Sequence, residues 1–254
     1  MTDTMDIANY LSRGGKLTNP ANVPTRYRGE LMRIMATFVD SELAGAAGFA
    51  DVINAGPGIK ERIAAAKIVL EKTDNADRVL RLMGEFGANT ERYANHHPWT
   101  DRLPRDTAPG STRSAHDMRL SVLNYPLDGW TDAVVMNFCT GHAVAVRLAD
   151  MVQVSYQPLA EALRDVAPVE ANHTQLAEEG LARLAESGAR EAIATSLDYW
   201  LPRVAAIFGD PPETRMAQMK DWGLRHRSAA EMRADWNARI AAGLERCGVP
   251  KPAD

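Results

Sequence analysis

Hydrophobic residues recur along this chain at intervals of three and four residues through most of its length. A period near 3.6 residues is the pattern of amphipathic α-helices, whereas the alternating β-branched runs that predict strands are scarce. We therefore predict an all-α protein. The predicted helices cover residues 27–54, 59–86, 130–153, 157–186, 189–208, 213–222 and 228–246.

Glycine and proline separate these helices. Residues 55–58 (AGPG) divide the first two helices, Gly188 ends the fourth, and residues 209–212 (GDPP) end the fifth. Residues 94–126 contain several prolines and predict a long connection between the second and third helices. Residues 1–24 are predicted to be irregular.

Two long helices, a long crossover and two more long helices follow each other in the order of a ferritin-like four-helix bundle. We predict a single domain over residues 1–254, with a core bundle at about 27–187 and a C-terminal helical extension at about 188–247. A chain of 254 residues is long enough to bury a sizeable core without disulfides or structural metals.

Charge and cysteine content exclude several classes of protein. The formal net charge of −4 is opposite to that of a nucleic-acid-binding domain or a polybasic membrane anchor. Two distant cysteines, Cys139 and Cys247, do not form a disulfide framework or a thiolate zinc finger, and they fit a reducing compartment. Because no apolar run is long enough for a membrane span and no signal-peptide pattern is present, we expect a cytoplasmic protein.

Each of the four long helices carries a polar residue within its apolar stripe. Burying one unpaired charge costs several kcal/mol, so we expect these groups to meet each other or to bind an ion near the middle of the bundle. The residues are Glu42 in the first helix, Lys72 and Asn75 in the second, His142 in the third, and Glu170 and His173 in the fourth.

Each of these residues also has a purely structural interpretation. An inward histidine is often a hydrogen-bonded core residue, and the register of His142 is one position away from the best stripe. The side chain of Lys72 could extend to the surface. Adjacent histidines at 96 and 97 lie in the long connection, where no carboxylate or cysteine at helical spacing supports a metal site.

Six segments of the chain share their order and spacing with one known family. They are VPTRYR (23–28), SELAG (41–45), WTD (130–132), SYQP (155–158), WGL (222–224) and EMR (231–233). Together they resemble the phenylacetate-catabolic oxygenase family, which comprises the ferritin-like subunits of the phenylacetyl-CoA epoxidase and their relatives. The resemblance covers residues 23–245 and implies a ferritin-like fold.

The resemblance also implies where a di-iron site would lie. Catalytic members of the family take ligands from a glutamate on the first helix, an E-x-x-H pair on the second, an acid on the third and another E-x-x-H pair on the fourth. Glu42 matches the first ligand, and Glu170 with His173 matches the last pair.

The remaining ligand positions of the family are not matched. Lys72 and Asn75 stand where the glutamate and histidine of the second helix belong. The acid of the third helix falls near Thr140 or Gly141, and neither of these residues supplies a carboxylate.

Counting charges favours a site that holds no metal. Two divalent ions are normally met by about four carboxylates, whereas this core offers Glu42 and Glu170 together with the positive Lys72. We therefore predict a structural, non-catalytic oxygenase subunit in which a lysine–carboxylate network replaces the di-iron site and no cofactor is bound. Such a subunit would act in a homo- or hetero-oligomer with a related ferritin-like subunit.

Two other interpretations remain open. His142, His173 and Glu170, with or without Glu42, could form a two-histidine-one-carboxylate site for iron, as in non-haem oxygenases. The chain would then be a metal-dependent monooxygenase acting on an aromatic acyl-CoA or a related small molecule. Alternatively, the chain is a helical scaffold that has lost both its metal and its original partner.

An acyl-CoA ligand is implied only by the resemblance. The sequence has no glycine-rich phosphate-binding loop. Arginines that could contact phosphates are Arg113, Arg119, Arg147, Arg225 and Arg227.

Overall fold

The computed structural model describes residues 6–95, 98–113 and 117–251, and within them the chain is all-α. The helices are α1 (Ile7–Ser12), η1 (Pro20–Asn22), α2 (Thr25–Val52), η2 (Ile53–Ala55), α3 (Ile59–Glu85), α4 (Glu91–Asn95), η3 (Ser121–Asn124), α5 (Gly129–Met151), α6 (Gln157–Glu186), α7 (Arg190–Ala205), η4 (Ala206–Phe208), α8 (Glu213–Asp221) and α9 (Ala229–Arg246). In the described residues the one β-type contact is an isolated bridge between Leu17 and Tyr156. No helix of this part of the chain is long and apolar enough to cross a membrane.

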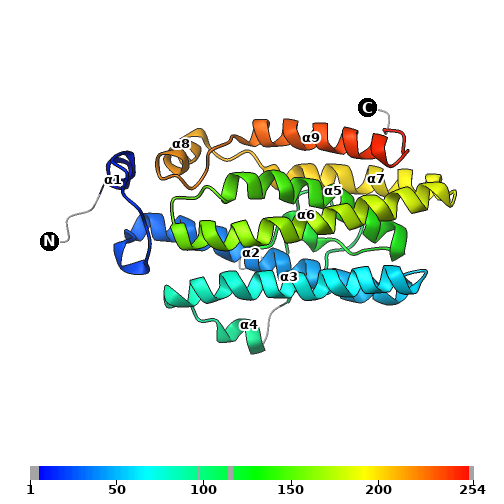
Figure 1. The fold of residues 1–254 in the computed structure, drawn as a ribbon, viewed down its shortest axis with the longest axis horizontal. Helices are drawn as coiled ribbons and strands as arrows, with labels where there is room; N and C mark the ends of the chain where they lie inside the picture. Colours follow the sequence, from blue (N-terminus) through cyan, green and yellow to red (C-terminus); the bar gives the residue numbers. More distant parts are fainter. Residues whose placement is uncertain (1–5, 96–97, 114–116, 252–254) are drawn as a thin grey trace.

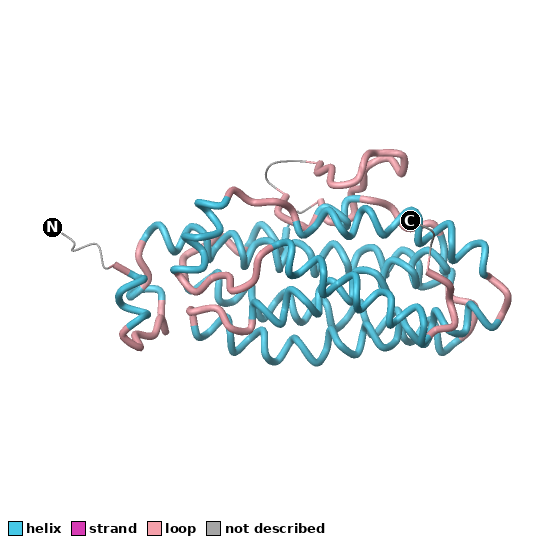
Figure 2. Tube along the Cα trace, turned by 90° about the horizontal axis from the view of Figure 1, so that it is seen from above, coloured by secondary structure: helices cyan, strands magenta, loops and turns pink. Residues whose placement is uncertain are grey.

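The four long helices α2, α3, α5 and α6 form the bundle. They run side by side along the long axis of the molecule (Figures 1 and 2). The hairpin of α2 and α3 packs against the hairpin of α5 and α6, mainly through contacts between α3 and α6. The connection after α3, which contains α4 and η3, carries the chain from one hairpin to the other, as the ferritin-like arrangement requires.

Local sequence explains several of the helix ends. Ser228 and Glu231 form a capping box that begins α9, and Pro158 occupies the first turn of α6, where a missing N–H costs little. Gly87 and Gly188 follow α3 and α6 with positive φ angles, which glycine adopts without strain.

One expectation about the N-terminal segment was wrong. Residues 1–24 were expected to be irregular, but α1 and η1 lie within them. Each begins with a polar cap: the side chain of Asp6 accepts a hydrogen bond from the Asn9 amide, and Asn19 caps η1. These helices are too short for hydrophobic periodicity to reveal them.

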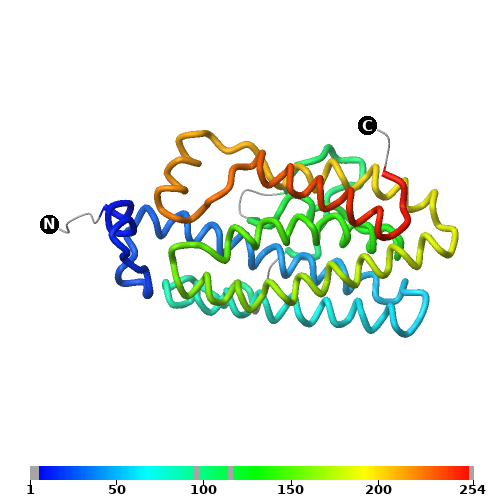
Figure 3. Tube along the Cα trace, turned by 45° about the horizontal axis from the view of Figure 1, so that its top comes forward, coloured from blue at the N-terminus to red at the C-terminus, as the bar shows by residue number. Residues whose placement is uncertain are grey.

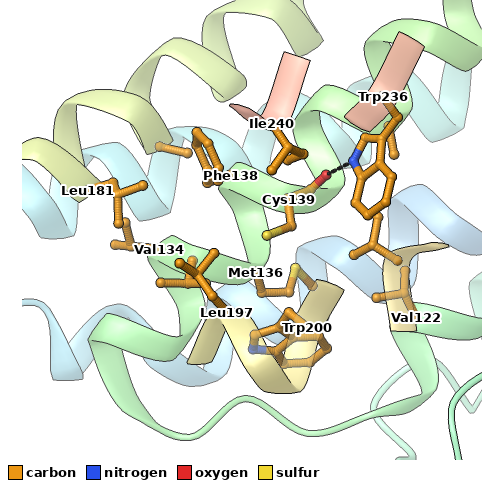
Figure 4. Packing of buried hydrophobic residues seen from close by; sticks show 14 of the residues in the cluster. Val122, Val134, Met136, Phe138, Cys139, Leu181, Leu197, Trp200, Trp236 and Ile240 are labelled. Atoms are coloured by element: carbon orange, nitrogen blue, oxygen red, sulfur yellow. Dashed lines mark hydrogen bonds between the residues drawn. The ribbon is translucent and has the colours of Figure 1, made fainter. Parts of the chain in front are cut away.

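The C-terminal extension covers the side of α5 that faces away from α2 and α3. Both α7 and α9 pack on α5. Trp200 from α7 and Trp236 from α9 lie near Met136 and Cys139 of α5 (Figure 4), and the Trp236 indole donates a hydrogen bond to the Cys139 carbonyl at 3.0 Å. Because α6 packs on one side of it and α7 and α9 on another, α5 buries every residue from Asp132 to Ala143.

A buried carboxylate ties the crossover to this extension. Asp132 on α5 accepts two hydrogen bonds from Arg105 in the crossover, at 2.9 and 3.0 Å. It also accepts bonds from Ser196 at 3.0 Å and from the Trp200 indole at 2.9 Å, both on α7. A buried carboxylate with this many donors is satisfied without a metal ion.

Candidate functional site

Side chains from three helices meet at Lys72 in the middle of the bundle. The Lys72 ammonium on α3 donates to Glu42 Oε1 on α2 at 3.3 Å and to both carboxylate oxygens of Glu170 on α6, at 2.9 and 3.0 Å. All three residues are buried. The sequence places them together because each occupies an inward position of its helix.

Asn75 adds a second bridge between the same carboxylates. It lies on α3 close to one turn beyond Lys72, so both side chains project from the same face. Its amide nitrogen donates to Glu42 Oε2 at 3.3 Å and to Glu170 Oε1 at 3.2 Å. Lys72 and Asn75 together therefore occupy the space between the two glutamates.

His173 extends the cluster along α6. Its Nδ1 lies 3.1 Å from Glu170 Oε1, and its Nε2 lies 2.8 Å from Glu71 Oε2 on α3. Glu71 was not predicted from the sequence, because it lies at the edge of the buried face of α3 and keeps 27% of its side chain exposed. Its position next to Lys72 was the only available signal.

The two glutamates differ strongly in acidity. Burial raises the pKa of Glu42 to about 8; the repulsion of Glu170 adds to the rise and Lys72 offsets part of it. Burial also acts on Glu170, but Lys72 and His173 overcome it and hold the pKa of Glu170 well below its ordinary value.

Lys72 keeps its charge in this environment. Burial opposes the charged form, but Glu170 and Glu42 raise the pKa of Lys72 above its ordinary value. At neutral pH the arrangement is therefore a buried Lys72–Glu170 ion pair next to a largely protonated Glu42.

The structure does not bring His142 to this cluster. Its Nε2 lies 3.2 Å from Glu178 Oε1, and its ring meets the edge of Phe138 on the side of α5 that α9 covers. Burial lowers the pKa of His142. The set of two histidines and one carboxylate that we considered from the sequence is therefore not assembled.

The acidic ligand of the family's third helix would fall near Thr140 or Gly141, and the packing around Gly141 leaves no room for a carboxylate side chain there. A Cβ atom on Gly141 would lie 2.5 Å from the Thr174 hydroxyl on α6, so α5 and α6 approach each other too closely for a larger residue there. The neighbouring Thr140 lines a cavity instead.

A cavity of about 450 Å³ reaches the cluster from the side of α5 and the C-terminal extension. Glu42, Lys72 and Glu170 contribute to its wall. Its apolar walls include Phe38, Met136, Leu148, Met219 and Met232. A cavity of this size, largely apolar with a few polar groups, is typical of a small-molecule site.

Arginines line the cavity away from the cluster. Arg33 precedes Glu42 by more than two turns of α2, and Arg147 lies near the end of α5. Burial lowers the pKa of Arg147 to about 9, with the neighbouring Arg225 adding to the effect. The arginines that line the cavity are Arg33, Arg147, Arg215 and Arg225.

Of the five arginines that the sequence suggested for phosphate contacts, Arg147 and Arg225 are the cavity-lining ones. The other three form ion pairs elsewhere. Arg113 pairs with Asp101, Arg119 with Asp117, and Arg227 with Asp235.

The residues of this cluster do not fit a di-iron centre. Glu42, Glu170 and His173 are the residues that match family ligands, and an ammonium group lies between the two carboxylates within hydrogen-bonding distance of both. A third carboxylate, that of Glu71, contacts the far side of the His173 ring and does not replace a missing ligand of the second or third helix. Across the described residues, no three or more histidine, cysteine, aspartate or glutamate side chains are grouped to hold a metal ion. The histidines at 96 and 97 lie outside the described residues.

Comparison with known proteins agrees with the resemblance noted in the sequence. No curated protein matches the chain. The family model described as phenylacetic acid catabolic protein matches residues 5–254, almost the entire chain. With its helical bundle and its full-length match, the chain belongs to the family of phenylacetic acid catabolic proteins.

Proposed function

We propose that this chain is a structural, non-catalytic ferritin-like subunit of an oxygenase, in which a lysine–carboxylate network stands in place of a di-iron site. One observation carries the proposal: the Lys72 ammonium lies within 3.3 Å of carboxylate oxygens from both Glu42 and Glu170. These two glutamates are the ones that match metal ligands of the family.

Electrostatics supports this proposal. Lys72 and Glu170 neutralise each other, and the high pKa of Glu42 leaves that side chain largely protonated at neutral pH. Two divalent cations would bring four positive charges to a buried region that holds an ammonium ion and one ionised carboxylate. The cluster therefore resists metal binding and joins α2, α3 and α6 instead.

A subunit of this kind works by holding a catalytic partner. We infer that the chain assembles with a related ferritin-like subunit in the cytoplasm. We also infer that the cavity receives an acyl-CoA, because its apolar walls suit an acyl group and Arg147 and Arg225 suit phosphates.

The alternative, a metal-dependent monooxygenase, is favoured by a different observation. The Glu170–His173 pair keeps the spacing of a di-iron half-site, and the cavity reaches Glu170, so a ligand could approach it. This interpretation requires Lys72 to give up both of its carboxylate contacts.

Metal content separates these two functions. We expect the protein purified from cells supplied with iron to contain metal far below one equivalent per chain, as measured by elemental mass spectrometry. The double variant Lys72→Glu, Asn75→His restores the family's ligands on α3 and should gain metal. A stoichiometric amount of iron, manganese or zinc in the unmodified protein, lost on His173→Ala, would contradict the proposed function.

Stability provides a second test of the network. Lys72→Met leaves Glu170 buried without its cation, so it should lower the free energy of unfolding by about 3–5 kcal/mol. Lys60→Met is the matched control, because Lys60 lies on the same helix at an exposed position away from the cluster. Urea unfolding of both variants measures the difference. Equal stability of the two variants would argue against the network.

A further inference from the structure

Exposed hydrophobic side chains in the described part of the chain are concentrated on one helix. The large ones are Ile59, Ile63 and Leu70, which are 78%, 61% and 63% exposed. All three belong to α3, although the molecule contains many helices with outer faces. Contiguous exposed apolar residues on one surface commonly mark an interaction site.

These residues form one stripe. Together with the exposed Ala66 they occupy positions 59, 63, 66 and 70, which alternate steps of four and three residues. That spacing places all four on one line along the helix, as in the seam of a coiled coil. We call these four residues the α3 stripe. It covers about three helical turns, or about 16 Å.

The rest of the fold leaves the stripe open. It lies on the N-terminal half of α3, at the edge of the bundle farthest from α7 and α9 (Figures 1 and 3). The short helix α4 lies beside the other half of α3 (Figure 1). The inner face of α3 is the one that packs on α2 and α6.

The charges beside the stripe are positive. Lys60 and Lys67 follow its members on one flank, Arg62 precedes Ile63 on the other, and all three are exposed. The acidic residues of this segment face α6: Glu61 lies 3.6 Å from Arg183, and Glu71 contacts His173 at 2.8 Å. The other carboxylate oxygen of Glu71 lies 3.7 Å from the Lys67 ammonium, and Arg62 donates to the Gly56 carbonyl at 3.1 Å, so Lys60 is the flanking cation with the fewest contacts inside the described chain. Beyond Leu70, Asp74 and Asp77 are acidic and exposed, and Asp77 pairs with Arg81.

A second copy of the chain does not fit this pattern. An antiparallel pair of α3 helices that matched Ile59 with Leu70 and Ile63 with Ala66 would place Lys60 beside Lys67 of the other copy. A parallel pair would place Arg62 beside Lys67 of the other copy. Like charges oppose each other in both arrangements, which disfavours association through this face.

We propose that the α3 stripe is the docking surface for an amphipathic helix of another protein, whose apolar residues are flanked by glutamates or aspartates. Apolar contacts along the stripe would supply affinity, and carboxylates opposite Lys60, Arg62 and Lys67 would set specificity and register. The inference rests on the proposed scaffold function and deepens it, because it identifies the surface and the chemistry through which a partner is held.

Designed helical peptides test the surface directly. Two peptides share a leucine stripe at heptad spacing; one carries glutamates at the flanking positions and the other carries lysines. Fluorescence anisotropy with the full-length protein measures both affinities at low and high salt. We expect the glutamate peptide to bind at least about tenfold more tightly, and its advantage to shrink as salt screens the charges.

Three variants locate the binding face. Ile63→Lys should weaken binding of the glutamate peptide by about tenfold or more, because a charge then interrupts the apolar seam. Ala238→Lys, at an exposed position of α9, is the matched control and should leave binding unchanged. Lys60→Glu should reduce the preference for the glutamate peptide. Circular dichroism verifies that each variant keeps its helical content.

The possible outcomes separate this proposal from the proposed function. Equal binding of both peptides, or no effect of Ile63→Lys, would overturn the docking surface, even in a protein free of metal. If analytical ultracentrifugation showed a dimer that Ile63→Lys abolishes, the stripe would bind a second copy of the chain, and the proposed docking of another protein would also be overturned. Selective peptide binding by a protein that carries stoichiometric metal would leave the surface intact and refute the scaffold function instead.

Discussion

Glu42 and Glu170 are identical side chains a few ångströms from one ammonium group, yet their acidities move in opposite directions. Glu170 receives two hydrogen bonds from Lys72 and a contact from His173, whereas Glu42 receives one longer bond from Lys72. Burial penalises both carboxylates, so the number and length of the cationic contacts decide which glutamate ionises. Lys72 thereby favours the ionised form of Glu170, while burial and the nearby Glu170 favour the protonated form of Glu42.

This difference predicts how stability depends on pH. In the folded protein Glu42 keeps its proton up to a pKa of about 8, whereas in the unfolded chain it titrates near 4.5. Between these values the folded state binds more protons, so the stability that Glu42 contributes is lost as pH rises toward 8. Glu42→Gln mimics the protonated form and should remove this decline, making the variant more stable than wild type by about 1–3 kcal/mol at pH 8–9.

Urea unfolding between pH 5 and 9 measures the effect, with Glu170→Gln as the matched comparison. Because the pKa of Glu170 is lowered, its contribution to stability is complete above pH 4.5 and is lost only on acidification. Glu170→Gln should therefore destabilise the protein throughout pH 5–9. If both glutamine variants behaved alike, the assignment of separate protonation states to Glu42 and Glu170 would be wrong.

Helix α6 carries a proline in its interior, close to the Lys72 cluster. Pro168 lies inside α6, two residues before Glu170, and the helix continues through it. Proline removes a backbone donor and crowds the preceding turn. Its side chain is exposed, so replacing it removes little packing. Pro168→Ala should raise the free energy of unfolding by about 1–3 kcal/mol.

Pro158 is the control within the same helix. It occupies the first turn of α6, where no intrahelical donor is required, so Pro158→Ala should change stability by less than about 1 kcal/mol. Thermal and urea unfolding of both variants provide the comparison. Loss of stability in Pro168→Ala would indicate that α6 needs a bend to place Glu170 beside Lys72.

The long helices could be predicted because each has one buried apolar face and because glycine or proline residues mark where they end. The predicted helix at 59–86 is α3 (Ile59–Glu85), and the prediction for 157–186 coincides with α6. The position of Glu42, Lys72 and Glu170 within the apolar stripes likewise predicted that these three side chains meet in the bundle core. Such a prediction depends on a helix having a solvent-exposed polar side. Only then does a polar residue on the inward side stand out from the apolar residues around it in the sequence pattern.

Helix α5 does not satisfy that condition. Since α7 and α9 cover its second side, His142 is buried against α9 rather than in the bundle, and the buried Asp132 could not be recognised as a link to the crossover. Glu71 was missed for a related reason: its contact with His173 depends on how closely α3 and α6 approach, which one helix alone does not reveal.

At the scale of the whole molecule, the cavity connects features that lie far apart in sequence. It lies between α2, α5 and the segment from η4 to α9, with the Lys72 cluster on one part of its wall and arginines on another. The extension thus supplies Arg215 and Arg225 as well as covering α5. An elongated ligand with an apolar end and an anionic end matches this division.

The cavity therefore leads to a binding prediction for the acyl-CoA proposed above. Arg147 lies next to Arg225 and donates to the Ile207 carbonyl at 3.3 Å. Asp150, 3.8 Å from Arg225, offsets part of the repulsion between the two arginines, and a bound anion would offset more of it. Arg147→Gln should weaken binding of phenylacetyl-CoA by about tenfold in isothermal titration calorimetry. Arg227→Gln is the matched control, since Arg227 pairs with Asp235 outside the cavity. Similar losses in both variants would show general charge attraction, whereas undiminished binding in Arg147→Gln would place the ligand elsewhere.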